Sequence, residues 1–222
     1  MGKPMAHFSP KWKISYTSVP KNACTSLKNM FYYIENKSNF VNLVRNGSVF
    51  HVHNFYGCKA FNPNELSDAS SYWKFAVVRD PLQRLVSCYR NRVLHHHELD
   101  ERFIAANFVK EGALPKPSLD VFVERLELYC RASRSIAHHT KPHVFFLGSD
   151  PHQYDRLFSI GELPLLVTEL CDRTGMELNL TKEQNLGPQM SVADLSPNAI
   201  DKLRAFYKKD YDIFDFQGPL GN

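Results

Sequence analysis

The stretch that decides the fold reads KWKISYTSVPKNACTSLKNMFYYI and runs from Lys11 to Ile34. Its opening part, up to Val19, is rich in β-forming side chains and stops at Pro20, which is typical of a strand. Apolar residues then recur at i, i+3, i+4 and i+7, the spacing of one helix face, at Leu27, Met30, Phe31 and Ile34. The sequence therefore predicts a strand, a short loop and a helix in immediate succession.

Further elements alternate in the same way along the chain. Strands are expected over Val49–Phe55, over Trp73–Val78, whose apolar run is typical of burial on both faces, and over Val144–Leu147. Four helices are expected from their capping residues or apolar stripes, and they begin at Asp80, Ser118, Leu163 and Ser196. Strands that alternate with helices predict an α/β fold in three layers, with a mostly parallel central sheet flanked by helices.

Length and composition describe an ordinary globular chain. It has 222 residues, of which 43% are hydrophobic, and we expect one domain over residues 1–222. No apolar run approaches the roughly 20 residues that span a bilayer, and the first residues lack the apolar core of a signal peptide. The five cysteines form no CxxC pair, so a reducing cytoplasm is the expected location. A net charge of +4 suits an anionic ligand, and no nucleic-acid-binding signature is present.

The loop PKNACTS, residues 20–26, carries the first chemical signal. It joins a predicted strand to a predicted helix, where free backbone N–H groups and the positive end of the helix dipole favour an anion. Lys21 adds a full positive charge, and Thr25 and Ser26 add hydroxyl donors. An ordinary helix cap by one of these hydroxyls is the alternative. The loop lacks the GxxxxGK[ST] pattern of nucleoside triphosphatases, so it predicts a phosphate cradle of another kind.

The segment RDPLQRLVS, residues 79–87, carries the second signal. Arg79 ends a predicted buried strand, a costly place for an arginine unless it meets a planar anion. Arg84, Ser87 and Asn91 share a helix face away from the apolar stripe. The alternative is a simple helix start at Asp80, with Arg79 paired to a carboxylate.

Two histidines, His51 and His53, alternate along the strand expected over Val49–Phe55 and so share one of its faces. Histidine titrates near neutral pH and suits general-base chemistry. A pair of edge-strand histidines without a task is the alternative.

Other histidines indicate no metal centre. His95, His96 and His97 are consecutive, and consecutive residues of a helix point in different directions. His139 and His143 have a spacing that zinc sites use, but no third ligand is evident.

Together, the two phosphate-binding segments resemble those of the PAPS-dependent sulfotransferases (PAPS is 3'-phosphoadenosine-5'-phosphosulfate). PKNACTS matches the 5'-phosphosulfate loop, and RDPLQRLVS matches the 3'-phosphate motif, including the seven residues between Arg79 and Ser87. Within that superfamily the chain is similar to the family 2, carbohydrate-type enzymes, among them the heparan sulfate 2-O-sulfotransferases. The direct matches cover Val19–Arg92, and the tail resembles the family less specifically.

This resemblance implies a P-loop-like fold, a PAPS donor, no metal and a role for each matching residue. It assigns the 5'-phosphosulfate to Lys21, Asn22, Ala23, Cys24, Thr25 and Ser26. It assigns the 3'-phosphate to Arg79 and Ser87. The 2-O-sulfotransferases have a similar HxH segment whose second histidine is the base, which makes His53 the expected base and His51 its neighbour or a substrate contact. Because some family members use a glutamate instead, Glu65 and Glu162 are alternative bases.

We therefore expect a sulfotransferase that moves a sulfuryl group from PAPS to an acceptor hydroxyl by in-line displacement, as in phosphoryl transfer. Lys21 would stabilise the charge that grows on the leaving phosphate oxygen. The resemblance implies a carbohydrate acceptor, on a glycan or glycolipid. Two alternatives remain: a small kinase-like phosphotransferase, and a non-catalytic nucleotide- or anion-binding module that would not need His53.

Overall fold

A computed structural model describes residues 5–45, 47–180 and 187–216 of the chain. The chain divides into two compact units, each assembled from segments that are distant in sequence. The first unit comprises Met1–Arg79, His143–Glu183 and Ile213–Asn222, and the second comprises Asp80–Pro142 and Gln184–Asp212. The single domain expected over residues 1–222 stays a prediction.

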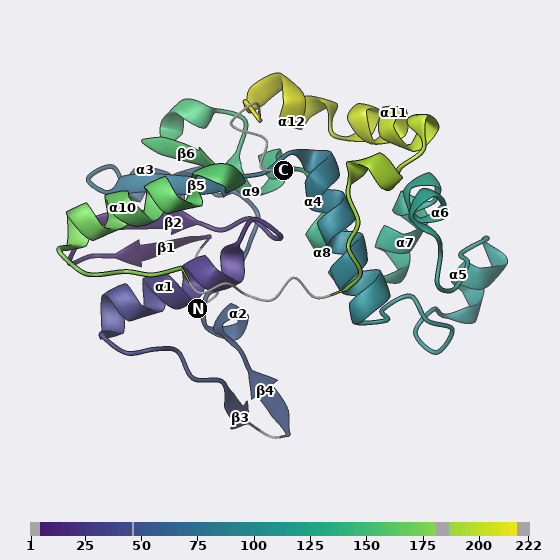
Figure 1. Cartoon of the computed structure of the whole chain (residues 1–222), viewed down its shortest axis with the longest axis horizontal. Coiled ribbons are helices and arrows are strands. Elements are labelled where there is room, and N and C mark those ends of the chain that lie inside the picture. Colours follow the sequence, from purple (N-terminus) through teal and green to yellow (C-terminus); the bar gives the residue numbers. More distant parts are fainter. Residues whose placement is uncertain (1–4, 46, 181–186, 217–222) are drawn as a thin grey trace. The chain divides into compact units, whose positions relative to one another are not determined.

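The first unit is built on a four-stranded sheet (Figure 1). Its strands lie in the order β1 (Ala6–Ser9), β2 (Ile14–Thr17), β5 (Trp73–Val78) and β6 (Arg156–Ser159). β1 pairs with β2 in the antiparallel sense, whereas β2 with β5 and β5 with β6 are parallel. The expected mostly parallel sheet is confirmed.

Helices cover both faces of this sheet because the side chains of β5 alternate between two cores. Phe75 and Val77 pack with α1 (Cys24–Asn36) and α10 (Leu163–Thr174) in one cluster. Ala76 and Val78 pack with α3 (Pro63–Asp68) and α9 (His143–Leu147) in the other. The three expected layers are therefore confirmed.

The segment that precedes β5 differs from the prediction. The strand expected over Val49–Phe55 is wrong: β4 ends at Phe50, and a short helix, α2 (Val52–Phe55), begins directly after it. β4 (Ser48–Phe50) pairs with β3 (Leu43–Arg45), in a hairpin that Figure 1 shows projecting away from α1. Side-chain capping at His51 turns the chain into a helix, and alternation of polar and apolar residues does not reveal such a cap.

The strand expected over Val144–Leu147 is also wrong, because these residues belong to helix α9. A short apolar run fits a buried strand and a buried helix equally well. The strand that completes the sheet is β6, and two turns of 3₁₀ helix flank it at Pro151–Gln153 and Ile160–Glu162.

The described part of the second unit is helical. Its elements are α4 (Pro81–Cys88), a π-helical segment η1 (Tyr89–His95), α5 (Ala106–Lys110), α6 (Leu119–Glu124), α7 (Leu126–Ala132), α8 (Arg134–Thr140), a 3₁₀ turn (Val192–Asp194), α11 (Pro197–Phe206) and α12 (Lys208–Ile213), whose last residue falls in the first unit. The predicted stripe of α4 lies in one buried cluster with residues of α6, α7 and α11. The helix expected after Ser118 is interrupted at Arg125, which separates α6 from α7.

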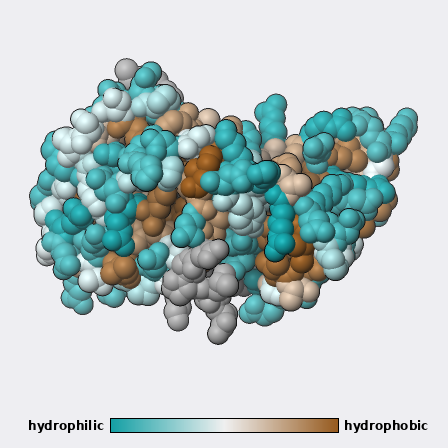
Figure 2. All heavy atoms as spheres, turned by 90° about the horizontal axis from the view of Figure 1, so that it is seen from above, coloured by the Kyte–Doolittle hydropathy of each residue, from teal (hydrophilic) through white to brown (hydrophobic). Residues whose placement is uncertain are grey.

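Hydrophobic side chains also reach the surface. Figure 2 shows them scattered among hydrophilic residues on the face drawn there. In the β3–β4 hairpin, Leu43, Val44 and Val49 are exposed. Among the residues that the structure describes, none of the helices has the length and hydrophobicity that crossing a membrane requires.

Candidate active site

The PKNACTS loop leaves β2 and enters α1 through an unusual backbone. Lys21 and Ala23 have left-handed φ values of 68° and 54°. Ala23 is the N-cap of α1, and no side chain caps the helix there. Alternating left-handed residues turn successive N–H groups to the same side, and the helix dipole adds partial positive charge. The loop therefore has the geometry of an anion cradle.

Asn22 holds this loop from inside the first unit. Its side chain is fully buried, and its Nδ2 donates to the carbonyl of Val77 on β5 at 2.8 Å. The same Nδ2 lies 3.1 Å from Nε2 of buried His143, the first residue of α9. An amide nitrogen only donates, so Nε2 of His143 is the acceptor. Asn22 thereby ties the loop to the sheet and to α9, a positioning role that its place in the motif did not reveal.

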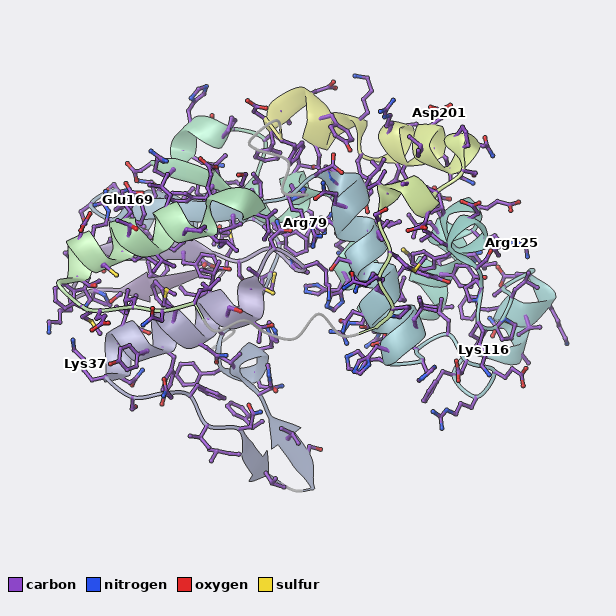
Figure 3. All side chains as sticks on the ribbon, viewed as in Figure 1. Lys37, Arg79, Lys116, Arg125, Glu169 and Asp201 are labelled. Atoms are coloured by element: carbon purple, nitrogen blue, oxygen red, sulfur yellow. The ribbon has the colours of Figure 1, made fainter. Side chains whose placement is uncertain are left out.

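Arg79, the first residue of the second motif, contacts the loop. It follows the last residue of β5, where Figure 3 labels it, and it is half-buried. Its guanidinium donates to the backbone carbonyl of Lys21 at 3.4 Å. The carboxyl ends of adjacent parallel strands meet at one edge of a sheet, and ligands bind at such edges. Arg79 and the loop therefore lie close together at this edge of the sheet.

His53 lies over the first turn of α1, although it is on α2 and not on a strand. Its Nε2 is 3.0 Å from Oγ1 of Thr25, and its Nδ1 is 3.1 Å from Nζ of Lys28. The imidazole is exposed, so an acceptor can reach it from solvent. Tyr56, directly after α2, donates to Glu35 of α1 at 2.5 Å and helps to hold α2 on α1.

His51, two residues before His53, caps helix α2. It is the N-cap of α2, where its Nδ1 accepts from the backbone N–H of His53 at 3.4 Å and its own N–H donates to Asn54. The rings of His51 and His53 stack with centroids 5.1 Å apart. The shared strand face was wrong, but the two rings are adjacent. A catalytic part for His51 stays a prediction.

The interior beneath the site disfavours added charge. His7 on β1 is buried, and its Nε2 lies 3.3 Å from Oγ of Ser18. Burial, together with the nearby Lys28 and His53, lowers the pKa of His7 to about 3. Glu35 of α1 is an exposed residue, and partial desolvation of its carboxyl raises its pKa.

Of the remaining expected residues, Cys24 and Thr25 are half-buried in the first turn of α1 and Ser26 is buried. Ser87 is a half-buried residue of α4 in the second unit. Its 3'-phosphate role stays a prediction.

Arg84 lies on the same helix as Ser87 but does not share its environment. Its side chain is fully buried and donates to the carbonyls of His139 and Lys141. Arg84 and Ser87 are one helical turn apart on α4, as their spacing predicts, and the Arg84 guanidinium binds the end of α8.

The carboxylates considered as alternative bases bind backbone N–H groups. Glu65 accepts from the N–H of Met5 at 2.6 Å, and Glu162 accepts from the N–H of Ser159 at 2.7 Å.

The other histidines have contacts within their own units. His139 Nδ1 donates to the carbonyl of Ser135 at 2.8 Å, so its Nε2 accepts from Arg92 at 3.1 Å. His97 lies 3.6 Å from Asp100. Among the described residues, no three His, Cys, Asp or Glu side chains are grouped as metal ligands would be. The absence of a metal stays a prediction.

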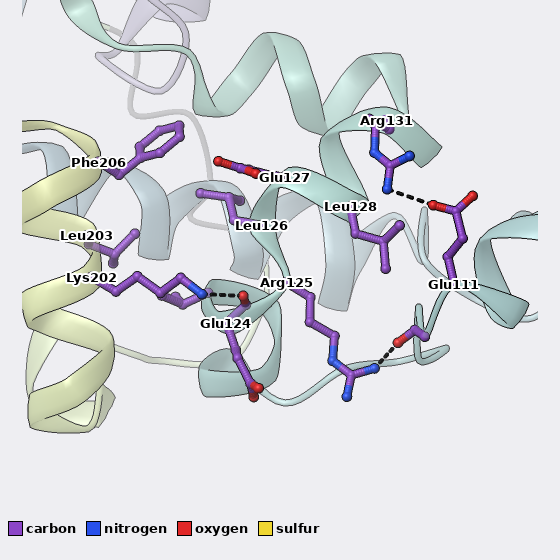
Figure 4. A pocket seen from close by; sticks show the side chains of 12 residues that line it. Glu111, Glu124, Arg125, Leu126, Glu127, Leu128, Arg131, Lys202, Leu203 and Phe206 are labelled. Carbon is purple, nitrogen blue, oxygen red and sulfur yellow. Dashed lines mark hydrogen bonds and ion pairs between the residues drawn. The ribbon is translucent and has the colours of Figure 1, made fainter.

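The second unit contains a cavity of about 560 Å³ that includes no predicted site residue. Its three basic residues bind protein oxygens: Arg131 pairs with Glu111 at 2.7 Å, Arg125 with the carbonyl of Gly112 and Lys202 with the carbonyl of Glu124 (Figure 4).

One residue of the site escaped sequence reasoning. Lys28 is buried with 1% of its surface exposed, and it contacts His53. The available signal was its spacing: Thr25 and Lys28 are i and i+3 on α1 and therefore share a helix face.

The first unit thus brings together a loop with the backbone of an anion cradle, an arginine at the neighbouring strand end and an exposed histidine at the first turn of α1, in an α/β fold of the kind that binds ligands at this edge of the sheet. The model of the Sulfotransferase family matches residues 4–160, and the chain belongs to this family. The expected family is confirmed.

Two similar proteins are both named as carbohydrate sulfotransferases. Carbohydrate sulfotransferase 14 of Mus musculus is 31% identical over 116 residues, which is 50% of this chain and 30% of that protein. Carbohydrate sulfotransferase 14 of Homo sapiens is 29% identical over a match of the same extent. The match thus spans less than a third of the relatives' length. No solved structure matches the chain.

Proposed function

We propose that this protein transfers a sulfuryl group from PAPS to a hydroxyl group of a carbohydrate. The observation that supports the proposal is the hydrogen bond from Arg79 to the carbonyl of Lys21, because it joins the first residue of the proposed 3'-phosphate motif to the proposed 5'-phosphosulfate loop. Family membership and the names of the two relatives support the same reaction and the acceptor class.

The loop residues fit an anionic donor. The left-handed backbone at Lys21 and Ala23 and the uncapped start of α1 supply N–H donors. When bound, PAPS supplies the sulfuryl group. Lys21 and the loop amides bind the 5'-phosphosulfate and place positive charge where negative charge grows on the leaving oxygen. Thr25 and Ser26 add hydroxyl donors, and Arg79 binds the 3'-phosphate, while the part that the family resemblance gives to Ser87 stays a prediction.

His53 acts as the general base in this proposal. It is exposed to an incoming acceptor, and its Nε2 lies 3.0 Å from Thr25 in the first turn of the anion loop's helix. A base in this place can take the proton of an acceptor hydroxyl that is held in line with the donor.

The alternatives lack this support. A kinase-like phosphotransferase would use a P-loop lysine spacing that the sequence does not contain. A non-catalytic binding module would have no use for His53. The acceptor proposed is a glycan or glycolipid, and the cytoplasmic location stays a prediction.

The test is transfer of radiolabelled sulfate from PAPS to a panel of glycans, glycolipids and phenols. We expect labelled carbohydrate and no labelled phenol. In parallel, adenosine 3',5'-bisphosphate should raise the melting temperature far more than ATP or GTP, since ligands of the native state stabilise it by mass action. Equal stabilisation by ATP would instead favour the kinase-like alternative.

A further inference from the structure

Three aromatic rings form a cluster beside α2, the helix that carries the proposed base. Phe55 is the last residue of α2, and the centroid of its ring lies 5.4 Å from that of Tyr32 on α1 and 6.1 Å from that of Phe40. The rings of Tyr32 and Phe40 meet edge to face at 5.1 Å. Each of the three rings therefore contacts the other two, and we call Tyr32, Phe40 and Phe55 the aromatic platform.

Phe55 remains accessible in spite of these contacts. Its exposed fraction is 47%, whereas Tyr32 and Phe40 are half-buried. The ring of Tyr56 adds a further contact, with its centroid 4.8 Å from that of Phe55. A ring that is already held by its neighbours loses little conformational entropy when a ligand binds to it. An exposed apolar surface beside a candidate site is typical of a ligand contact.

The aromatic platform lies further along α1 than the proposed base. His53 contacts Thr25 in the first turn of α1, and Phe55 contacts Tyr32 of the same helix. Thr25 and Tyr32 are at i and i+7, so they share a face of α1 and are roughly 10 Å apart along its axis. This separation is longer than one sugar ring. The platform is therefore placed for a sugar beyond the one that reacts.

Aromatic rings suit sugars because a pyranose ring with equatorial hydroxyl groups presents C–H bonds on both of its faces. Such a face can lie flat on an aromatic ring, while the hydroxyl groups at the rim of the sugar need hydrogen-bonding partners. Asn54, directly before Phe55, is exposed, and its Oδ1 accepts from the N–H of His51 at 2.8 Å. Its Nδ2 can donate to a hydroxyl group at that rim.

We propose that the aromatic platform is a subsite for a sugar of the acceptor beyond the one that is sulfated, so that the protein prefers oligosaccharides to single sugars. Phe55 is the residue that determines this preference. The inference rests on the proposed function, because it takes the bound sugar to be part of the acceptor. A lipid chain of a glycolipid is the competing occupant, and it would bind the exposed aliphatic side chains of the β3–β4 hairpin, such as Val44 and Val49.

The first experiment measures binding without turnover. Its probes are N-acetylglucosamine and its β-linked oligomers up to the tetrasaccharide, because their ring hydroxyl groups are equatorial. We expect the oligomers to bind the wild type about 3–10-fold more tightly than the monosaccharide, the scale of one aromatic contact. Phe55→Leu keeps an apolar side chain but removes the ring, so it should lose this gain, and Phe55→Trp should retain it. Affinity that does not rise with length in the wild type, or that rises equally in Phe55→Leu, would overturn the inference.

The matched control is Phe103→Leu, because Phe103 is an exposed phenylalanine of the second unit, and this variant should keep the wild-type affinities. Val44→Ser should keep them too. An octyl glycoside of N-acetylglucosamine probes the competing occupant. If it bound more tightly than the oligomers and Val44→Ser removed that advantage, a lipid chain would be the ligand of this region and the inference would be wrong. Circular dichroism and melting temperatures check that each variant folds.

Kinetics then connect the aromatic platform with sulfuryl transfer. For an oligosaccharide that accepts sulfate from PAPS, Phe55→Leu should raise the acceptor KM about 3–10-fold and leave kcat unchanged, since binding at a remote subsite is the same in the ground state and the transition state. The KM of the corresponding single sugar should not change. An unchanged KM for the oligosaccharide would overturn the inference. Absence of sulfuryl transfer to every acceptor would sink the proposed function, whereas the length-dependent affinity at Phe55 would stand.

Discussion

At the scale of single residues, a few side-chain contacts fix the orientation of the His53 ring in the candidate site. Thr25, Lys28 and His53 form one connected set, in which each of the two helix residues contacts a different ring nitrogen. Because Thr25 and Lys28 are one helical turn apart, the orientation of α1 fixes the imidazole from two sides. The choice of His53 as the expected base followed from a family resemblance, but its contact with Lys28 was found only in the structure.

The first residue-scale prediction concerns the base. His53→Ala should lower kcat by roughly 10²–10⁴-fold, the scale of a lost general base, and should leave the affinity for adenosine 3',5'-bisphosphate nearly unchanged. His51→Ala should cost less, because His51 caps α2 and does not contact Thr25 or Lys28 in any hydrogen bond of the described residues. Steady-state kinetics with labelled PAPS measure both. Full activity in His53→Ala would refute the assignment.

The second residue-scale prediction concerns Asn22, whose buried hydrogen bonds hold the PKNACTS loop. Asn22→Ala removes the donor to the Val77 carbonyl and to His143, so buried acceptors lose their partner at a cost of about 1–3 kcal/mol in unfolding free energy. Nucleotide affinity should fall as well, since the loop loses its anchor. Denaturant unfolding and calorimetric titration with adenosine 3',5'-bisphosphate measure the two effects.

The matched control is Asn36→Ala at the other end of α1. Asn36 also donates through Nδ2 to a carbonyl, that of Tyr32 at 2.9 Å, but in an exposed place. Its loss should change stability by no more than about 0.5 kcal/mol. If the two variants behaved alike, burial of the Asn22 contacts would not be what holds the loop.

At the scale of elements, helix ends offer a clean comparison. α10 ends at Gly175 with φ 62°, and α1 ends at Lys37 with nearly the same φ of 57°. A Cβ on Gly175 would meet nothing within 4 Å, so Gly175→Ala tests the backbone alone. We expect a loss of about 1 kcal/mol, the cost of a left-handed residue with a side chain. Lys37→Gly should stabilise the protein by a few tenths to about 1 kcal/mol.

Denaturant unfolding of both variants measures these effects, and we expect the slope of unfolding free energy against denaturant concentration to be unchanged. Neither position touches the anion loop, so nucleotide affinity serves as an internal control and should not change. A stabilising Gly175→Ala would contradict the backbone argument.

An element could be predicted when the residues that determine it lie within the element or directly beside it in the sequence. β5 and α4 were predictable because a mainly apolar run and the Asp80-Pro81 cap are local, and Asp80 indeed accepts from the N–H of Gln83. The start of the helix expected at Ser118 and the end of α10 at Gly175 were predictable for the same reason.

Elements decided by distant contacts were not predictable. α9 forms where its buried Phe146 and Leu147 pack in the cluster of Ala76 and Val78. β6 exists because β5 offers an edge for pairing, with Phe75 beside Arg156 and Val78 beside Ser159. Such pairing needs residues about 80 positions apart, and a local pattern does not contain it.

At the scale of the whole molecule, the division into two units was beyond sequence reasoning. Each unit collects segments separated by long stretches of chain, such as residues 143–183 joining 1–79. Composition reports only that the chain can bury a core, not how many cores it forms. The three buried clusters respect the division, since one lies in the second unit and two lie on the faces of the first unit's sheet.

The stability of the molecule should depend on pH through His7. Burial lowers its pKa to about 3 in the folded state, whereas an unfolded histidine has its ordinary value of about 6.5. Above pH 6.5 neither state binds the proton. As the pH falls from 6.5 toward 3, the unfolded state binds it and the folded state does not, so this group removes stability by up to about 1.4 kcal/mol per pH unit.

Denaturant unfolding at a series of pH values across this window measures the loss. His7→Gln removes the titrating group from β1 and should flatten the profile over the window, although the variant is expected to be less stable at neutral pH because the contact with Ser18 changes. His152→Gln is the matched control, since His152 is an exposed histidine of the same unit and its removal should preserve the wild-type profile. If unfolding free energy fell with pH equally steeply in the wild type and in His7→Gln, His7 would take up its proton without unfolding.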